Sequence, residues 1–189
     1  MTLPLIVFAL ESESRGLFAP HRVLHTGVGK VNAAHALTKA IDAERPGVVI
    51  NLGSAGSAVH AAGSVVACTA FVQRDMDVTP LGFAPHATPF DATPVPLVYG
   101  HPVPGLPEAT CGTGDRFETA HTGGGYDIVD MEAFALALVC QREDVPFACL
   151  KYISDGADGA AAQDWGKALE DGAAKLRAAL GDFLRAFPI

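Results

Sequence analysis

The sequence has few basic residues and few cysteines, and both shortages exclude classes of protein. Its 189 residues contain 13 Lys and Arg against 21 Asp and Glu, so the formal net charge is −8. Such a balance attracts neither nucleic acid nor an anionic membrane surface, and we expect neither as a partner. The four cysteines show no CxxC spacing and lie in or beside apolar runs. This is typical of reduced core thiols in a cytoplasmic protein.

Signals for export or membrane insertion are also missing. The N-terminal MTLPLIVFALESE has no positively charged start and reaches Glu11 after a short apolar run, which does not fit a secretory signal. Residues 47–73 carry no formal charge and could span a bilayer by length, but polar residues and glycines interrupt them. Two buried strands joined by a glycine-rich loop explain this stretch better.

Known nucleotide, hydrolase and metal motifs fail on their spacing. TGVGK lacks the first glycine and the final Ser or Thr of a P-loop, and GSAGS matches neither GxGxxG nor GxSxG. The seven histidines show no HExxH or other ligand spacing. We therefore expect no metal and no organic cofactor.

The sequence does contain an alternation of apolar runs and helical patterns. Strands are expected at 3–10, 22–27, 47–56, 64–72, 109–113 and 146–154, and helices at 29–46, 129–140 and 165–187. Residues 79–107 hold most of the prolines and show no period, so a long irregular loop is expected there. The alternation predicts one α/β domain over residues 1–189. Its central twisted sheet is mostly parallel or mixed and is flanked by helices on both faces, giving three layers.

Acidic and glycine-rich segments follow four of the predicted strands. They are FALESES with Glu11 and Glu13, NLGSAGSA with Ser54, GTGDRFE with Asp115, Phe117 and Glu118, and YISDGADG with Ser154, Asp155 and Asp158. Open α/β sheets bind ligands at the carboxyl ends of their strands. We therefore expect an acidic pocket at this edge of the sheet.

One more carboxylate, Glu132, lies in the apolar helical segment VDMEAFALALVC, residues 129–140. A helix that is apolar on every side is usually buried, and a buried carboxylate without partners is costly. Because Glu132 is near the start of the predicted helix, we expect it to reach the same sheet edge.

Seven segments resemble, in order, the methylthioadenosine/S-adenosylhomocysteine nucleosidase branch of the purine nucleoside phosphorylase superfamily. They are ALESE, TGVGKVNAAHAL, INLGSAG, RDMDVTPLGF, GTGDRF, VDMEAFALALVCQREDVPF and YISDGAD. The resemblance implies a nucleoside phosphorylase-like fold and hydrolysis of the N-glycosidic bond of a purine nucleoside. The substrate would be a 5′-modified adenosine. It further implies a homodimer or higher homo-oligomer.

The resemblance also implies roles for single residues. Asp155 would pass a proton to N7 of the purine, with Ser154 alongside, and Glu13 would activate the attacking water. Glu11 is the local rival of Glu13, because both side chains would point the same way in an extended segment.

The remaining implied residues bind the substrate. Met131 and Glu132 would lie under the ribose, with Glu132 on its 2′ and 3′ hydroxyls, Phe117 would stack on the purine, and Ser54 would lie near the sugar and the water. Packing beside glycines is an equally good account of Ser54, and a core position is the alternative for Phe117. Asp115 is expected to be structural.

The sequence departs from the family pattern at two positions, and two alternative functions are left open. Lys151 stands where the family usually has arginine, and Asp130 where it often has glutamate. A phosphate-dependent phosphorylase is the close variant of the nucleosidase. A relative that binds a nucleoside without turning it over is the second alternative.

Overall fold

The computed structural model describes residues 3–119, 124–157 and 161–187, and it describes the side chains of all of these except 161–168. Its strands are β1 Leu5–Phe8, β2 Arg22–His25, β3 Val49–Gly56, β4 Val65–Gln73, β5 Leu97–Val98, β6 Glu108–Thr113, β7 Ile128–Asp130 and β8 Phe147–Asp155. Its helices are α1 Glu11–Ser14, α2 Lys30–Ala43, α3 Ala133–Arg142 and α4 Ala161–Ala186, with a 3₁₀ turn, η1, at Thr79–Leu81.

The eight strands of the described residues join one mixed sheet. The order is β2-β1-β3-β7-β6-β4-β5, and β8 pairs with both β3 and β4. Strand β1 runs parallel to β2 and β3, β3 runs parallel to β8, and β6 runs parallel to β4 and β7. The antiparallel pairs are β4 with β5, β4 with β8 and β3 with β7. Strand β8, FACLKYISD, is buried along its whole length, as expected of a strand covered on both faces.

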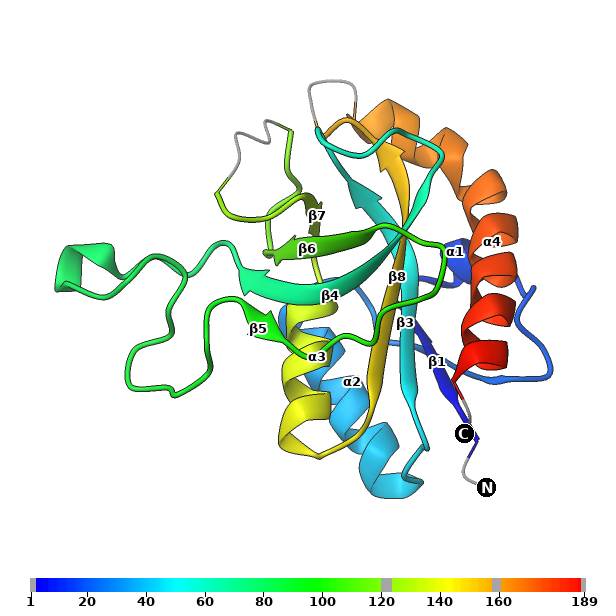
Figure 1. The fold of residues 1–189 in the computed structure, drawn as a ribbon, viewed down its shortest axis with the longest axis horizontal. Coiled ribbons are helices and arrows are strands. Elements are labelled where there is room, and N and C mark those ends of the chain that lie inside the picture. The colour runs from blue at the N-terminus through cyan, green and yellow to red at the C-terminus, as the bar shows by residue number, and fades with distance from the viewer. Residues whose placement is uncertain (1–2, 120–123, 158–160, 188–189) are drawn as a thin grey trace.

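Helices cover both faces of this sheet, so the molecule has three layers (Figure 1). On one face α2 and α3 share a hydrophobic cluster with the sheet, to which they contribute residues such as Leu37, Phe134 and Leu136. On the other face α4 packs through Leu176 and Phe183. The predicted α/β fold class is confirmed.

Two local predictions were wrong. Ile128–Asp130 pair with β6 as strand β7, so the predicted helix over 129–140 begins only at Ala133. Its first N–H groups are capped by neighbours, because Asp130 Oδ2 accepts from the Ala133 N–H at 2.9 Å and Thr113 Oγ1 from the Phe134 N–H at 2.9 Å. The segment after β1, expected to be extended, forms the short helix α1.

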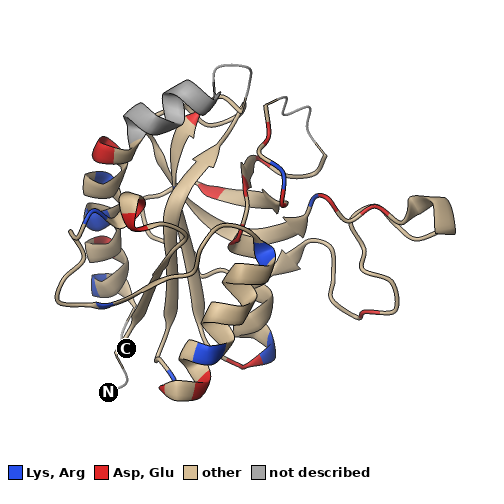
Figure 2. Cartoon of the chain, turned by 180° about the vertical axis from the view of Figure 1, so that it is seen from behind, with Lys and Arg blue, Asp and Glu red and all other residues tan. Residues whose placement is uncertain are grey.

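The proline-rich stretch after β4 projects from the body of the molecule (Figure 1). It contains η1 and the short strand β5 and is otherwise irregular, as predicted. Figure 2 shows acidic but no basic residues along the projection itself. Phe90 and Leu81, 99% and 75% exposed, make its surface apolar. In the described part of the chain, no helix is long and apolar enough to cross a membrane.

Candidate active site

A cavity of about 180 Å³ opens at the carboxyl ends of β1, β3 and β8. It is lined by seven residues that the sequence suggested for a site, namely Glu13, Ser54, Phe117, Met131, Glu132, Ser154 and Asp155. They come from five separate segments: α1, β3, the loop after β6, the β7–α3 junction, and the end of β8. The fold therefore brings three carboxylates from distant parts of the chain to one hollow.

Helix α1 separates the two glutamates that the sequence left as rivals. At 100° per residue, Glu11 and Glu13 point to nearly opposite sides of a helix, so the expectation that they share a side was wrong. Glu11 is exposed, whereas Glu13 is buried. Glu13 Oε1 accepts hydrogen bonds from the Ser54 hydroxyl at 2.9 Å and the Ser54 N–H at 3.1 Å, and Oε2 accepts from the Leu10 N–H at 3.1 Å.

Asp155 is held just as firmly at the end of β8. The Ser154 hydroxyl donates to Asp155 Oδ2 at 2.7 Å, and the Ala157 N–H donates to Oδ1 at 2.8 Å. Gly56 of β3 lies directly beside this carboxylate. A Cβ at Gly56 would come within 2.7 Å of Asp155 Oδ1, so only glycine leaves room for the aspartate in this position.

Glu132 is the residue before α3 and is only 8% exposed. Its Oε1 accepts a hydrogen bond from the Gly29 N–H at 2.8 Å, at the start of α2. Burial, followed by the nearby Asp130 charge, raises the pKa of the Glu132 carboxyl to about 7. Because one backbone donor serves this carboxyl, it remains able to bind further hydroxyl groups in the cavity.

A buried ion pair lies beneath Glu132. Lys151 Nζ of β8 and Asp130 Oδ2 of β7 are 2.8 Å apart, and their side chains are 2% and 1% exposed. Burial alone would raise the pKa of Asp130, but the Lys151 ammonium and hydrogen bonds from the Thr113 hydroxyl and the Ala133 N–H hold it below its ordinary value. Both residues stand out in the sequence, but their pairing was not predicted. The signal was Lys151 within the largely apolar run FACLKYI and Asp130 directly after Ile128 and Val129.

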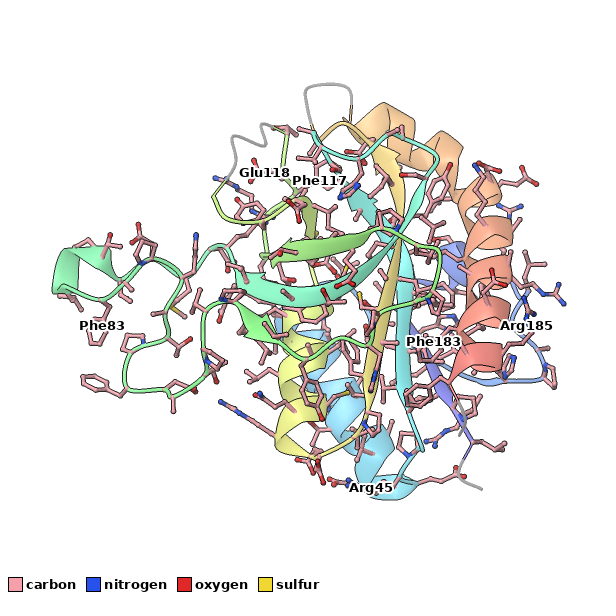
Figure 3. The ribbon with its side chains drawn as sticks, in the orientation of Figure 1. Arg45, Phe83, Phe117, Glu118, Phe183 and Arg185 are labelled. Atoms are coloured by element: carbon pink, nitrogen blue, oxygen red, sulfur yellow. The ribbon has the colours of Figure 1, made fainter. Side chains whose placement is uncertain are left out.

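Phe117 and its neighbour Glu118 lie in the loop that follows β6 (Figure 3). Phe117 is 46% exposed and forms part of the cavity wall, so the alternative of a core position is excluded. Asp115 has a structural contact, since its Oδ1 accepts the Lys30 N–H at 2.8 Å at the start of α2. Asp158, named with the last strand exit, lies outside the described residues.

Among the described residues, no group of three His, Cys, Asp or Glu side chains is arranged to hold a metal ion. The described residues that line the cavity supply carboxylates, hydroxyls and apolar groups, and none of them is Lys or Arg. The arrangement can bind hydroxyl groups, transfer protons and stabilise positive charge.

Comparison with known proteins gives nucleosidases among the most similar relatives. The chain is 36% identical over 157 residues to a 5′-methylthioadenosine/S-adenosylhomocysteine nucleosidase of Exiguobacterium. The alignment covers 72% of this chain and 67% of the relative. The chain is 31% identical over 180 residues to the same enzyme of Bacillus cytotoxicus, covering 75% and 71%.

Solved structures show the same fold. A variant of this nucleosidase from Helicobacter pylori, crystallised with 5′-methylthioadenosine, has a TM-score of 0.86 at 21% identity, over 99% of this chain and 100% of the other. Futalosine hydrolase of the same organism has a TM-score of 0.86 at 22% identity, over 97% of each chain. A model of the phosphorylase superfamily matches residues 18–187. The chain therefore belongs to the phosphorylase superfamily.

Proposed function

We propose that the protein is a purine nucleosidase that hydrolyses the N-glycosidic bond of a 5′-modified adenosine, such as methylthioadenosine or S-adenosylhomocysteine. The observation that carries the proposal is the meeting of three buried carboxylates, Glu13, Glu132 and Asp155, in one cavity. Two relatives of this family at 31–36% identity are nucleosidases for these two compounds, which supports the same substrate class here.

Each carboxylate has a separate task in this reaction. Cleavage passes through a sugar with oxocarbenium character, and it is accelerated by protonating the leaving base and by stabilising the cation. Asp155, oriented by Ser154 and Ala157, delivers the proton to N7 of the base. Glu132 binds the 2′ and 3′ hydroxyls of the ribose, with Met131 packed beneath the sugar.

Glu13 and Ser54 hold and activate the water that attacks the sugar. The Ser54 hydroxyl and N–H fix one carboxylate oxygen, which leaves the carboxylate oriented toward the cavity. Phe117 stacks on the purine at the opposite end. No metal or organic cofactor takes part in these steps.

A phosphate-dependent phosphorylase is the second candidate, and the charge of the cavity argues against it. Phosphate needs cationic partners, and the described residues lining the cavity include no Lys or Arg. The cations close to the cavity are already paired: Lys151 with Asp130, and Arg74 and Arg116 of the adjoining hollow with Glu118.

The proposal extends to assembly and location. The exposed Phe90 and Leu81 on the projection after β4 give it an apolar surface suited to a homodimer contact. The four free, buried thiols suit the reducing cytoplasm. Sedimentation at several protein concentrations tests the dimer.

Base release from methylthioadenosine, S-adenosylhomocysteine, adenosine and inosine, with and without phosphate, tests the function. Adenine release without phosphate is the expected result. Release only with phosphate would establish the phosphorylase instead. Binding of these nucleosides without release would establish a non-catalytic relative.

A further inference from the structure

The loop that carries Phe117 is held by a residue to which the reaction above gives no task. Arg74 follows β4 directly, and its side chain is only 4% exposed. Its Nη1 donates to Glu118 Oε2 at 3.0 Å. Its Nη2 donates to the carbonyl oxygens of Gly114, at 3.5 Å, and Arg116. One guanidinium thus binds three points within residues 114–118, the first part of the loop between β6 and β7.

These contacts bracket Phe117 in the sequence. Arg116, immediately before it, is held by its carbonyl oxygen, and Glu118, immediately after it, is held by its carboxylate. Figure 3 shows Phe117 and Glu118 next to each other in this loop. Because both neighbours are fixed by one rigid, planar group, the backbone at Phe117 has little freedom to turn its ring away from the cavity.

The residue after Arg74 holds the start of the same loop. Asp75 Oδ2 accepts the Asp115 N–H at 2.9 Å, and its other oxygen pairs with the Lys30 ammonium at 2.5 Å. The Arg74 N–H itself donates to the Thr113 carbonyl at 2.9 Å, so the anchor is fixed to the end of β6. The loop is therefore tied to the sheet and to α2, and Phe117 forms part of the cavity wall.

The Arg74 guanidinium is not fully satisfied in its buried position. Among the described residues, its Nε is buried without a hydrogen-bond partner, and an unsatisfied buried donor is costly. A shorter or apolar side chain would avoid that cost but would leave the Glu118 carboxylate, whose side chain is 10% exposed, without this cation. What arginine provides is the fork that reaches a carboxylate and two carbonyls at once, which a lysine ammonium cannot reproduce with the same geometry.

We propose that Arg74 is a positioning residue that holds Phe117 against the purine and so sets the affinity of the site for the base. The inference rests on the proposed function, because it requires a purine at Phe117. It adds a specific dependence: Arg74 acts on the substrate through Phe117 and has no contact of its own with the reacting atoms.

A double-mutant cycle on Arg74→Lys and Phe117→Ala tests this dependence. Stacking of a base on an aromatic ring contributes enough that each single variant should weaken adenine binding about tenfold and raise KM for methylthioadenosine similarly. The value of kcat should change much less. In the Phe117→Ala background, Arg74→Lys should weaken adenine binding less than about twofold, because the effects of two residues that act through one contact are not additive.

Arg116→Lys is the matched control, since Arg116 pairs with the same Glu118 carboxylate from a side chain that is 76% exposed. It should leave adenine binding at the wild-type level, and thermal unfolding should show every variant folded. If Arg74→Lys does not fold, Glu118→Gln weakens the same contact from the other side and replaces it in the cycle.

Two results would overturn the inference while leaving the proposed function intact. One is wild-type adenine affinity in Arg74→Lys. The other is a cycle in which the two single losses multiply. A wild-type protein that neither binds adenine nor releases it from a nucleoside would overturn the proposed function, and this inference with it.

Discussion

Lys151 Nζ and Asp130 Oδ2 lie 2.8 Å apart in a place where neither side chain meets solvent. Asp130 also accepts the Ala133 N–H and the Thr113 hydroxyl, so the pair connects β8 to β7 and to the start of α3. Glu132 is the next residue but one. The ion pair thus forms the support of the carboxylate that we assign to the ribose.

Removing one partner of this pair should be severe. Lys151→Met leaves Asp130 buried without its cation, and breaking a buried pair in this way typically lowers the free energy of unfolding by about 3–5 kcal/mol. Urea unfolding at neutral pH measures the change. Arg142→Met, which breaks an exposed pair with Asp91, is the control and should cost at most about 1 kcal/mol. An equal decrease in the free energy of unfolding of the two variants would show that burial does not make the Lys151 pair more important for stability than the exposed pair.

Glu132 should make the stability of the protein depend on pH. Its pKa is about 7 when folded against 4.5 for the ordinary group, so the folded state keeps the proton longer. The proton on Glu132 adds up to about 3 kcal/mol to the free energy of unfolding. This stabilisation is fully present below pH 4.5 and is lost as the pH rises through 7. Glu132→Gln cannot titrate. Its unfolding free energy, relative to wild type, should therefore increase between pH 4.5 and 7, and a constant difference would contradict the raised pKa.

Glu13 and Glu11 provide a matched pair of substitutions two residues apart. Glu13→Gln removes the proposed base and should lower kcat at least about 100-fold, a typical effect of losing one acid–base group. Glu11→Gln changes an exposed side chain on the other side of α1 and should leave kcat near the wild-type value. Adenine release from methylthioadenosine measures both. The reverse ranking would reassign the base to Glu11.

Asp155→Asn should separate binding from catalysis. The amide oxygen can still accept the Ala157 N–H, so the loop after β8 keeps its shape, but the residue can no longer deliver a proton. We expect kcat to fall by about 100- to 10,000-fold while methylthioadenosine still binds. Titration calorimetry gives the binding, and an assay of base release gives the rate. A variant with near wild-type turnover would rule out Asp155 as the acid.

The strands and the helices with a clear period could be predicted from the sequence, because burial on one or both faces leaves a direct pattern of apolar residues. This succeeded for the strands near 47–56 and 146–154 and for the apolar stripe of the last helix. It failed at Ile128–Asp130, where a helical spacing of apolar residues continued into a strand. Pairing with β6 decided that segment, and pairing between distant strands leaves no local signal.

The site was predicted by resemblance more than by pattern. Turn-like composition around Asp155 and Ser54 gave no reason to expect buried side chains, yet Asp155 is 5% exposed. The rivalry of Glu11 and Glu13 depended on whether four residues form a helix, which is too short to leave a period. The contacts of Arg74 join residues 40 or more positions apart, so only the fold could reveal them.

Strand β3 has hydrogen-bonded neighbours on both sides, because it pairs with β8 along its whole length, with β1 over Val49–Asn51 and with β7 at Gly56. It also carries Ser54 and Gly56, which hold Glu13 and make room for Asp155. Its amide protons should therefore exchange with solvent mainly through global unfolding. The half of the cavity that holds the attacking water should thus keep its shape for as long as the protein stays folded.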